Sequence, residues 1–140
     1  MNITKAISQL DSLMPNVFNE SLKRQWLSEV DAVIVMLRKH YMLSDEEQAV
    51  VDEWAEYTDT TPGETELLVG IPFTDIYLNY MAAKINYLQS DINRYNNAMA
   101  LYQKTYESYA NEFNRLHTPA KTSIVAFPSN GDEATEWVIP

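Results

Sequence analysis

The chain has 140 residues, of which 46% are hydrophobic, three are glycine and none is cysteine. This length and composition indicate one compact domain, and they exclude a disulfide-stabilised scaffold and a cysteine nucleophile. Twenty acidic residues against ten basic residues give a net charge of −10, and the two histidines, His40 and His117, are too few and too far apart for a Cys/His zinc site.

The negative charge is concentrated in one part of the chain. Residues 45–75 contain ten acidic residues and no lysine or arginine, so the remaining residues carry ten acidic and ten basic side chains and are neutral. The sequence has no basic cluster that would bind nucleic acid by releasing counterions from phosphates. Apolar runs such as residues 32–37 are far shorter than the roughly 20 residues that span a bilayer, and residues 1–14 lack the pattern of a secretory signal. We therefore expect a protein of the cytoplasm that contacts no membrane.

Two amphipathic helices are predicted in the first 40 residues. Residues 2–13 repeat apolar side chains at helical spacing as far as Leu13 and Met14. The second helix is predicted over about residues 20–40, with Asn19 as its N-cap. Its apolar stripe comprises Leu22, Trp26, Val30, Val33, Ile34 and Leu37.

The acidic connecting region, about residues 41–71, follows these helices. Ser44 and Glu47 form a capping-box pattern, which predicts a short helix. That helix is expected to place Val50, Val51 and Trp54 against the body of the protein. Residues 58–64 are predicted to be a loop and residues 65–71 an extended segment packed on the core.

A long helical pair is predicted next, over residues 73–90 and 92–113. Residues 89–91 have the composition of a tight turn, with Ser90 or Asp91 as the N-cap of the second helix, so the pair should be antiparallel. The second helix carries a seam with steps of three and four residues. The seam comprises Ile92, Tyr95, Met99, Tyr102, Tyr106, Tyr109 and Phe113.

The last 21 residues, 120–140, differ from the rest because proline and glycine interrupt two short apolar clusters without helical periodicity. These clusters comprise Ile124, Val125, Phe127, Trp137, Val138 and Ile139. We predict an extended C-terminal arm, with a hairpin of two short strands as an alternative. Trp137 favours docking of the arm onto another molecule over folding back on its own domain. The predicted fold is therefore all-α: a small helical bundle over residues 1–119, with a long antiparallel helix pair, followed by the arm.

No pattern of residues indicates catalysis, a metal or a cofactor. Neither histidine follows a glutamate at the spacing of a di-iron bundle, no calcium-binding loop or Gly-x-Ser-x-Gly sequence is present, and three glycines cannot form a phosphate-binding loop. Tyr95, Tyr102, Tyr106 and Tyr109 could stack on bases, but basic residues do not alternate with them, and a helix–helix seam is favoured. An enzyme would need a buried carboxylate pair, which the sequence leaves open.

A series of segments resembles one known family. The segments are Thr65-Glu-Leu-Leu-Val, Pro72-Phe-Thr-Asp-Ile-Tyr, Met81-Ala-Ala-Lys-Ile, Arg94-Tyr-Asn-Asn-Ala-Met-Ala-Leu and Tyr109-Ala-Asn-Glu-Phe-Asn-Arg-Leu-His-Thr-Pro. In this order they resemble the small head–tail connector proteins, also called adaptor or head-completion proteins, of tailed phages and prophages of Gram-positive bacteria. The N-terminal part, from Ala6 to Val33, is similar as well. The resemblance covers about residues 3–119.

The resemblance implies a structural protein of the virion neck that assembles in the host cytoplasm. Such proteins form a ring, usually of twelve copies, beneath the portal protein, where they extend the DNA channel and offer a docking surface to stopper or tail-completion proteins. Their C-terminal arm commonly reaches the portal, so we expect the apolar residues of 120–140 to bind it. The tyrosine seam would then also serve contacts between subunits, and double-stranded DNA would pass without specific binding.

The acidic residues suggest a further hypothesis and a competing function. A channel should repel DNA, so some acidic side chains should face the channel or its mouth. The candidates are Asp45, Glu46, Glu47, Asp52, Glu53, Glu56, Asp59, Glu64 and Glu66. The alternative is a small acidic regulatory protein that mimics DNA and occupies a basic site on a host enzyme. The alternative predicts a monomer or dimer, whereas the connector predicts a ring on assembly.

Overall fold

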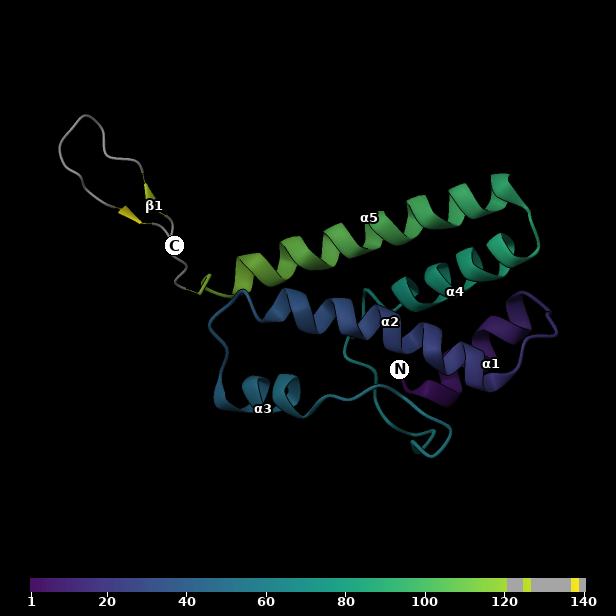
Figure 1. The fold of residues 1–140 in the computed structure, drawn as a ribbon, viewed down its shortest axis with the longest axis horizontal. Helices are drawn as coiled ribbons and strands as arrows, with labels where there is room; N and C mark the ends of the chain where they lie inside the picture. The colour runs from purple at the N-terminus through teal and green to yellow at the C-terminus, as the bar shows by residue number, and fades with distance from the viewer. Residues whose placement is uncertain (121–124, 127–136, 139–140) are drawn as a thin grey trace.

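The computed structural model describes residues 1–120, 125–126 and 137–138. These residues form five α-helices and one pair of two-residue strands (Figure 1). The elements are α1 (Ile3–Leu13), α2 (Glu20–Arg38), α3 (Asp45–Glu53), α4 (Asp75–Leu88), α5 (Ile92–Leu116), β1 (Val125–Ala126) and β2 (Trp137–Val138). The fold is all-α, as predicted, and α4 packs against α5 as an antiparallel pair.

Side chains cap the N-termini of four of these helices, because the first backbone N–H groups of a helix have no partner within it. The capping residues are Asn2 for α1, Asn19 for α2, Ser44 for α3 and Asp91 for α5. At α3 the predicted capping box is complete: the Glu47 N–H donates to Ser44 Oγ at 3.2 Å, and the Ser44 N–H donates to Glu47 Oε1 at 3.0 Å. In the α4–α5 turn Ser90 has a φ of 62°, so the predicted tight turn is confirmed, with Asp91 as the cap.

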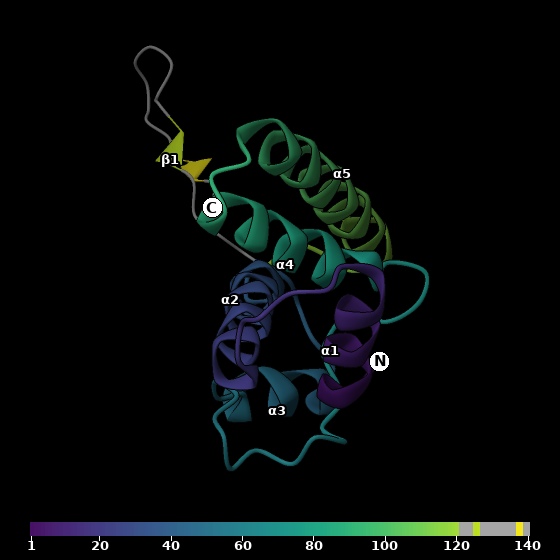
Figure 2. The same ribbon diagram turned by 90° about the vertical axis from the view of Figure 1, so that its right-hand side faces the viewer.

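The helices are arranged in three layers (Figures 1 and 2). The α4–α5 pair lies on one side, α1 and α2 lie in the middle, and α3 with the segment that follows it lies on the opposite side. The core lies where α1, α2 and α4 meet. Its fully buried residues include Ile3, Leu27, Val30, Ile34, Ile76, Tyr77, Met81 and Ile85.

Several apolar residues that were expected in the core are exposed. Leu13, in the last turn of α1, is 71% exposed, and Val50 of α3 is 43% exposed. Val33 is 37% exposed because it lies two residues, or about 200° of helix rotation, from the buried Asp31. Ile71 is 89% exposed because a turn, closed by the Phe73 N–H donating to the Gly70 carbonyl at 2.9 Å, carries it away from the core.

Candidate interaction surfaces

A buried carboxylate anchors the acidic connecting region to the helical body. Asp31 of α2 is fully buried. Its Oδ2 accepts hydrogen bonds from Tyr57 Oη at 2.6 Å and from the Leu68 N–H at 3.2 Å, and its Oδ1 accepts one from Tyr77 Oη at 2.6 Å. Burial raises the pKa of the Asp31 carboxyl group, and the hydrogen bonds from the two tyrosines oppose this shift.

The direction of these hydrogen bonds is set by the other partners of the tyrosines. Tyr57 Oη also accepts from Trp54 Nε1 at 3.1 Å, and Tyr77 Oη accepts from the Val69 N–H at 2.7 Å. Each hydroxyl has one hydrogen to donate, and it is directed at Asp31. Burial raises the pKa of both tyrosines, with the Asp31 charge as the next cause. Asp31 therefore accepts hydrogen bonds on both oxygens and ties two tyrosines and the Leu68 backbone to α2.

Two arginines of α2 bind the same region through its backbone. Arg24 is 6% exposed, and its Nη1 donates to the carbonyl oxygens of Thr58 and Thr61 at 2.8 and 2.6 Å. Arg38 donates from Nη2 to the Leu68 carbonyl oxygen at 2.9 Å and from Nε to Tyr109 Oη at 3.1 Å. Together with Asp31, these contacts fix the chain from Trp54 to Val69 on one side of the molecule.

The acidic residues predicted to face a channel lie on α3 and in the chain that follows it, which form one outer layer of the molecule (Figures 1 and 2). Eight of the nine are exposed, and Glu47 is partly exposed. Asp59 accepts a hydrogen bond from Ser21 Oγ at 2.5 Å, and Glu66 pairs with the N-terminal amine of Met1 at 3.3 Å. Five of the nine lie on α3, and the other four, Glu56, Asp59, Glu64 and Glu66, lie in the segment that Asp31, Arg24 and Arg38 bind to α2. We refer to the nine side chains as the acidic layer.

Glu47 also joins the acidic layer to the end of α5. Its Oε2 lies 2.8 Å from Nε2 of His117, whose Nδ1 lies 3.0 Å from the Phe113 carbonyl oxygen. The His117 ring stacks on Phe113 with 3.7 Å between ring centroids. Because both oxygens are acceptors, both ring nitrogens can donate only when the imidazole carries two protons.

Replacing the Glu47 carboxylate should destabilise the fold near neutral pH but not in strong acid. The N–H of Ser44 and then His117 hold the pKa of Glu47 below its ordinary value of 4.5. A carboxylate whose pKa is lower in the folded state stabilises the fold above its unfolded pKa, and this contribution is lost as the pH falls through the folded pKa. Relative to the wild-type chain, Glu47→Gln should lose about 0.5–1 kcal/mol of unfolding free energy near neutral pH. This loss should shrink as the pH falls below 4.5 and vanish once the pH is below the folded pKa of Glu47.

Urea unfolding at a series of pH values measures this difference. The matched control is Glu46→Gln, at an exposed residue in the same turn. Its unfolding free energy should equal that of the wild type at every pH. If the loss of unfolding free energy in Glu47→Gln stayed constant down to the lowest pH measured, this would contradict the contact between Glu47 and His117.

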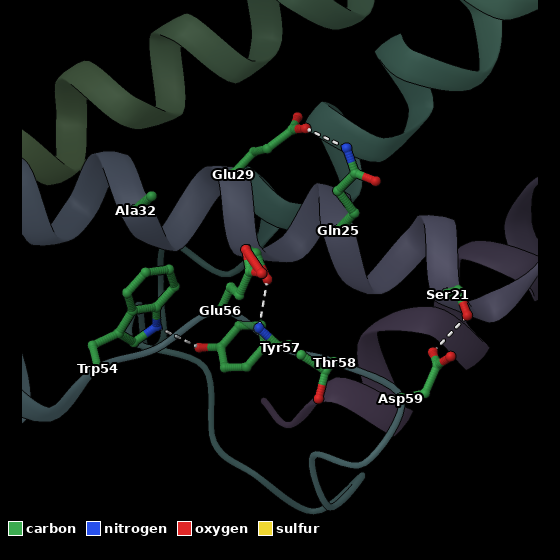
Figure 3. Close-up of a pocket in the computed structure, with 10 residues that line it drawn as sticks. Ser21, Gln25, Glu29, Ala32, Trp54, Glu56, Tyr57, Thr58 and Asp59 are labelled. Atoms are coloured by element: carbon green, nitrogen blue, oxygen red, sulfur yellow. Dashed lines mark hydrogen bonds between the residues drawn. The ribbon is translucent and has the colours of Figure 1, made fainter.

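A groove of about 560 Å³ lies between α2 and the chain that follows α3, and Figure 3 shows the residues that line it. Glu56 and Asp59, in the chain that follows α3, contribute acidic side chains to its lining. The Glu29 carboxylate is directed toward α4, where it accepts from Tyr80 Oη at 2.5 Å and lies 3.4 Å from Lys84 Nζ. The aromatic wall of the groove is Trp54 with Tyr57, whose rings meet edge to face at 5.9 Å between centroids. The polar side chains of the groove mostly bond to one another. Within the described residues, no three histidine, aspartate or glutamate side chains are arranged to hold a metal ion.

The tyrosines of the predicted seam on α5 pack against aromatic residues of the same chain. Ring centroids are 5.5 Å apart for Tyr95 and Tyr87 and 5.0 Å apart for Tyr102 and Tyr80, so α5 meets α4 through paired tyrosines. Tyr106 stacks on Tyr102, and Tyr109 packs edge to face on Phe73 in the segment before α4. Tyr95, Tyr102 and Tyr106 are partly exposed, and their outer edges are the part of the seam that another subunit could contact.

A second groove lies at the end of α5 from which the arm departs. It has a volume of about 510 Å³, and its apolar lining comprises Ile71, Pro72, Phe73, Tyr109, Phe113 and Leu116. Leu116 is 62% exposed. The opposite end of the molecule also exposes apolar side chains, including Leu13 and, at 94%, Val17. Apolar surface is therefore uncovered, in the described part of the chain, at two ends of the protein.

Three of the six residues predicted to bind the portal lie outside the part of the chain that the structure describes. Ile124, Phe127 and Ile139 lie outside the described residues. For Val125, Trp137 and Val138 the structure gives the backbone, in which Val125 pairs with Val138 and Ala126 with Trp137 as an antiparallel ladder. The extended arm with two short strands is therefore found in part.

The sequence prediction missed the contacts of Asp31, Arg24 and Arg38. One signal was available: Asp31 follows Leu27 by four residues and precedes Ile34 by three, so a carboxylate falls within the apolar face of α2. Asp31 is also the one carboxylate that is buried among residues 1–120. The buried carboxylate pair that an enzyme would need is therefore not found in that part of the chain.

None of the helices that the structure describes is both long and apolar enough to cross a membrane. Comparisons with models of protein families, with curated proteins and with solved structures found no match for this chain. A function for the chain therefore has to be inferred from its sequence pattern and its surfaces.

Proposed function

We propose that this protein is a structural head–tail connector of a tailed phage or prophage. It binds beneath the portal protein as a ring of about twelve copies, extends the DNA channel and offers a docking surface to stopper or tail-completion proteins. The observation that carries the proposal is the ordered series of segments over residues 3–119 that resembles this family. The helical body followed by a C-terminal arm agrees with what the resemblance implies.

The acidic layer supports a role beside DNA. A channel wall has to keep a constant shape while DNA moves past it, and Asp31, Arg24 and Arg38 bind the chain from Tyr57 to Leu68, which carries Asp59, Glu64 and Glu66, to α2. Like charges on the wall and on the phosphates repel each other, so DNA would pass without adhering.

The uncovered apolar surface supports assembly. A ring needs two different contact surfaces on each copy, because each subunit meets its neighbours through opposite sides. The described chain exposes Leu13 and Val17 at one end and Ile71 and Leu116 at the other. The competing DNA-mimic function also fits the acidic layer, but it gives no role to these apolar ends or to the apolar clusters of the arm.

Co-expression with a tagged portal protein from the same genome tests the proposal. The chain should copurify with the portal in a fixed ratio that corresponds to a closed ring, as measured by native mass spectrometry. A tagged major capsid protein serves as the control bait. A portal that purifies without the chain, while the chain is present and soluble, would contradict the connector function.

Neutralising part of the acidic layer should slow DNA movement through the connector. Asp45, Glu46, Glu53 and Glu56 are exposed, and replacing them with asparagine or glutamine should leave the fold intact. The nine candidate carboxylates would then retain five charges. Particles with this variant should eject DNA more slowly than wild-type particles in a fluorescence ejection assay, because repulsion is weaker. An unchanged ejection rate would show that the layer does not face the DNA.

A further inference from the structure

The short helix α3 buries little of its surface. Val51 is the one residue of this helix that is buried. A helix of nine residues is not stable in water on its own, so the position of α3 depends on its contacts with the rest of the chain. The residues on either side of it, Leu43 and Trp54, are partly buried against the core. A polar contact at the N-terminal end of α3 therefore contributes a substantial share of what holds this end in place.

Glu47 makes this contact, and its two oxygens have different partners. Oε1 accepts from the Ser44 N–H, within the first turn of α3 itself. Oε2 lies 2.8 Å from Nε2 of His117, which is 70 residues further along the chain. The first hydrogen bond stabilises the helix, and the second contact attaches the helix to the C-terminal end of α5.

The position of His117 suits a positively charged ring. His117 is the C-cap of α5, where the last carbonyl groups have no partner within the helix and the helix dipole favours a positive charge. Its Nδ1 lies 3.0 Å from one of these carbonyl oxygens, that of Phe113, and its side chain is 16% exposed. The ring stacks on Phe113, which fixes its plane. A ring with two N–H groups satisfies both acceptors, whereas a ring with one leaves an acceptor facing a lone pair.

Among residues 1–120, Glu47 is the one carboxylate that pairs with His117. The other charged or titratable side chains on the elements around the ring are Arg38 of α2, His40 and Tyr41 after it, Asp45 and Glu46 of α3, and Tyr109, Glu112 and Arg115 of α5. Of these, Arg115 pairs with Glu112, and Arg38 donates to Tyr109. The attachment of the N-terminal end of α3 to α5 therefore depends on the protonation of one imidazole.

We propose that His117 is a pH-sensitive latch: with two protons on its ring it holds the N-terminal end of α3 against the end of α5, and with one proton it releases that end. Histidine loses its second proton between about pH 5 and about pH 8, and Glu47 is ionised in this range because its pKa is held below 4.5. The latch is therefore closed in mild acid and opens as the pH rises. Opening moves the five acidic side chains of α3 relative to the four that are bound to α2. This switch goes beyond the connector function, because it requires no portal, ring or DNA.

Electron paramagnetic resonance with two spin labels measures the opening, and the chain offers a clean background because it has no cysteine. The labels attach to Ala49→Cys on α3 and to Glu107→Cys on α5, both at exposed positions. At about pH 5.5 the distance between the labels should have one narrow distribution, and at about pH 8.5 a second population with longer distances should grow. This population should rise about fivefold, the factor that a partly exposed ion pair contributes. The same distribution at both pH values would overturn the proposal.

Two variants of the labelled chain assign the opening to His117. His117→Phe keeps an aromatic ring beside Phe113 but removes both N–H donors, so it should show the longer distances at both pH values. His40→Gln, at the exposed second histidine, is the matched control and should respond to pH as the unsubstituted chain does. A pH response that persists in His117→Phe, or one that disappears in His40→Gln, would overturn the latch.

The comparison at two pH values needs neither variant, so it tests the latch even where a substitution disturbs folding. Copurification with the portal protein is measured separately and decides the connector function. A failure of the latch and a failure of the connector function are therefore told apart.

Discussion

Replacing Asp31 with asparagine is expected to lower the free energy of unfolding by about 2–4 kcal/mol, because it disrupts a fully buried hydrogen-bond network. The hydroxyls of Tyr57 and Tyr77 both donate to this carboxylate, one to each oxygen. An asparagine amide replaces one oxygen with a donor group, so one tyrosine hydroxyl would face another donor. The acidic region would lose its anchor along with the stability.

Urea unfolding followed by the fluorescence of Trp26 and Trp54 measures this change. The matched control is Asp52→Asn, the same substitution at an exposed carboxylate of α3, which should change the unfolding free energy by less than about 0.5 kcal/mol. Equal effects of Asp31→Asn and Asp52→Asn would contradict the role of the buried network.

Deleting the arm after Ala120 is expected to abolish copurification with the portal while the helical fold stays intact. The deletion keeps the backbone hydrogen bond from Ala120 to His40, which ties the end of the body to α2. Circular dichroism and the midpoint of urea unfolding should therefore match those of the full-length chain. The double variant Phe127→Ala with Trp137→Ala should reduce the portal-bound fraction at least tenfold, since large aromatic side chains commonly dominate the binding energy of an interface.

The control replaces exposed apolar side chains of the α4–α5 pair to which no contact is assigned, Leu88→Ala with Leu101→Ala, which are 51% and 53% exposed in the wild type. This variant should still bind the portal. A portal-bound fraction that survives deletion of the arm would refute the arm's role, and a loss in the Leu88/Leu101 variant alone would move the contact to the α4–α5 pair.

Local sequence signals predicted the helices well. Asn2, Asn19, Ser44 and Asp91 bond to backbone groups within three residues, so their roles as caps depend on nearby sequence alone. The spacing of three and four residues likewise placed Tyr102 and Tyr109 on the face of α5 that packs. The spacing of apolar residues did not predict that Val33, at the edge of the apolar stripe of α2, is exposed. Such spacing gives the direction of the buried face of a helix but not its width.

The surfaces were less predictable because they depend on contacts between distant residues. Asp31 binds Tyr57 and Tyr77, which are 26 and 46 residues away, and Arg38 binds Tyr109, 71 residues away. Nothing in residue spacing specifies such pairs. The turn at Gly70 that exposes Ile71 also forms one wall of the groove at the C-terminal end of α5, which exists only once α5 has packed beside that turn.

A reconstruction of the chain bound to its portal protein by electron cryomicroscopy tests the connector function most directly. It should show a closed ring of copies coaxial with the portal. The arm, residues 120–140, should contact the portal, and the acidic layer should face the channel or its mouth. A chain that binds as isolated copies, or a ring that lacks any contact between the arm and the portal, would contradict the proposed function.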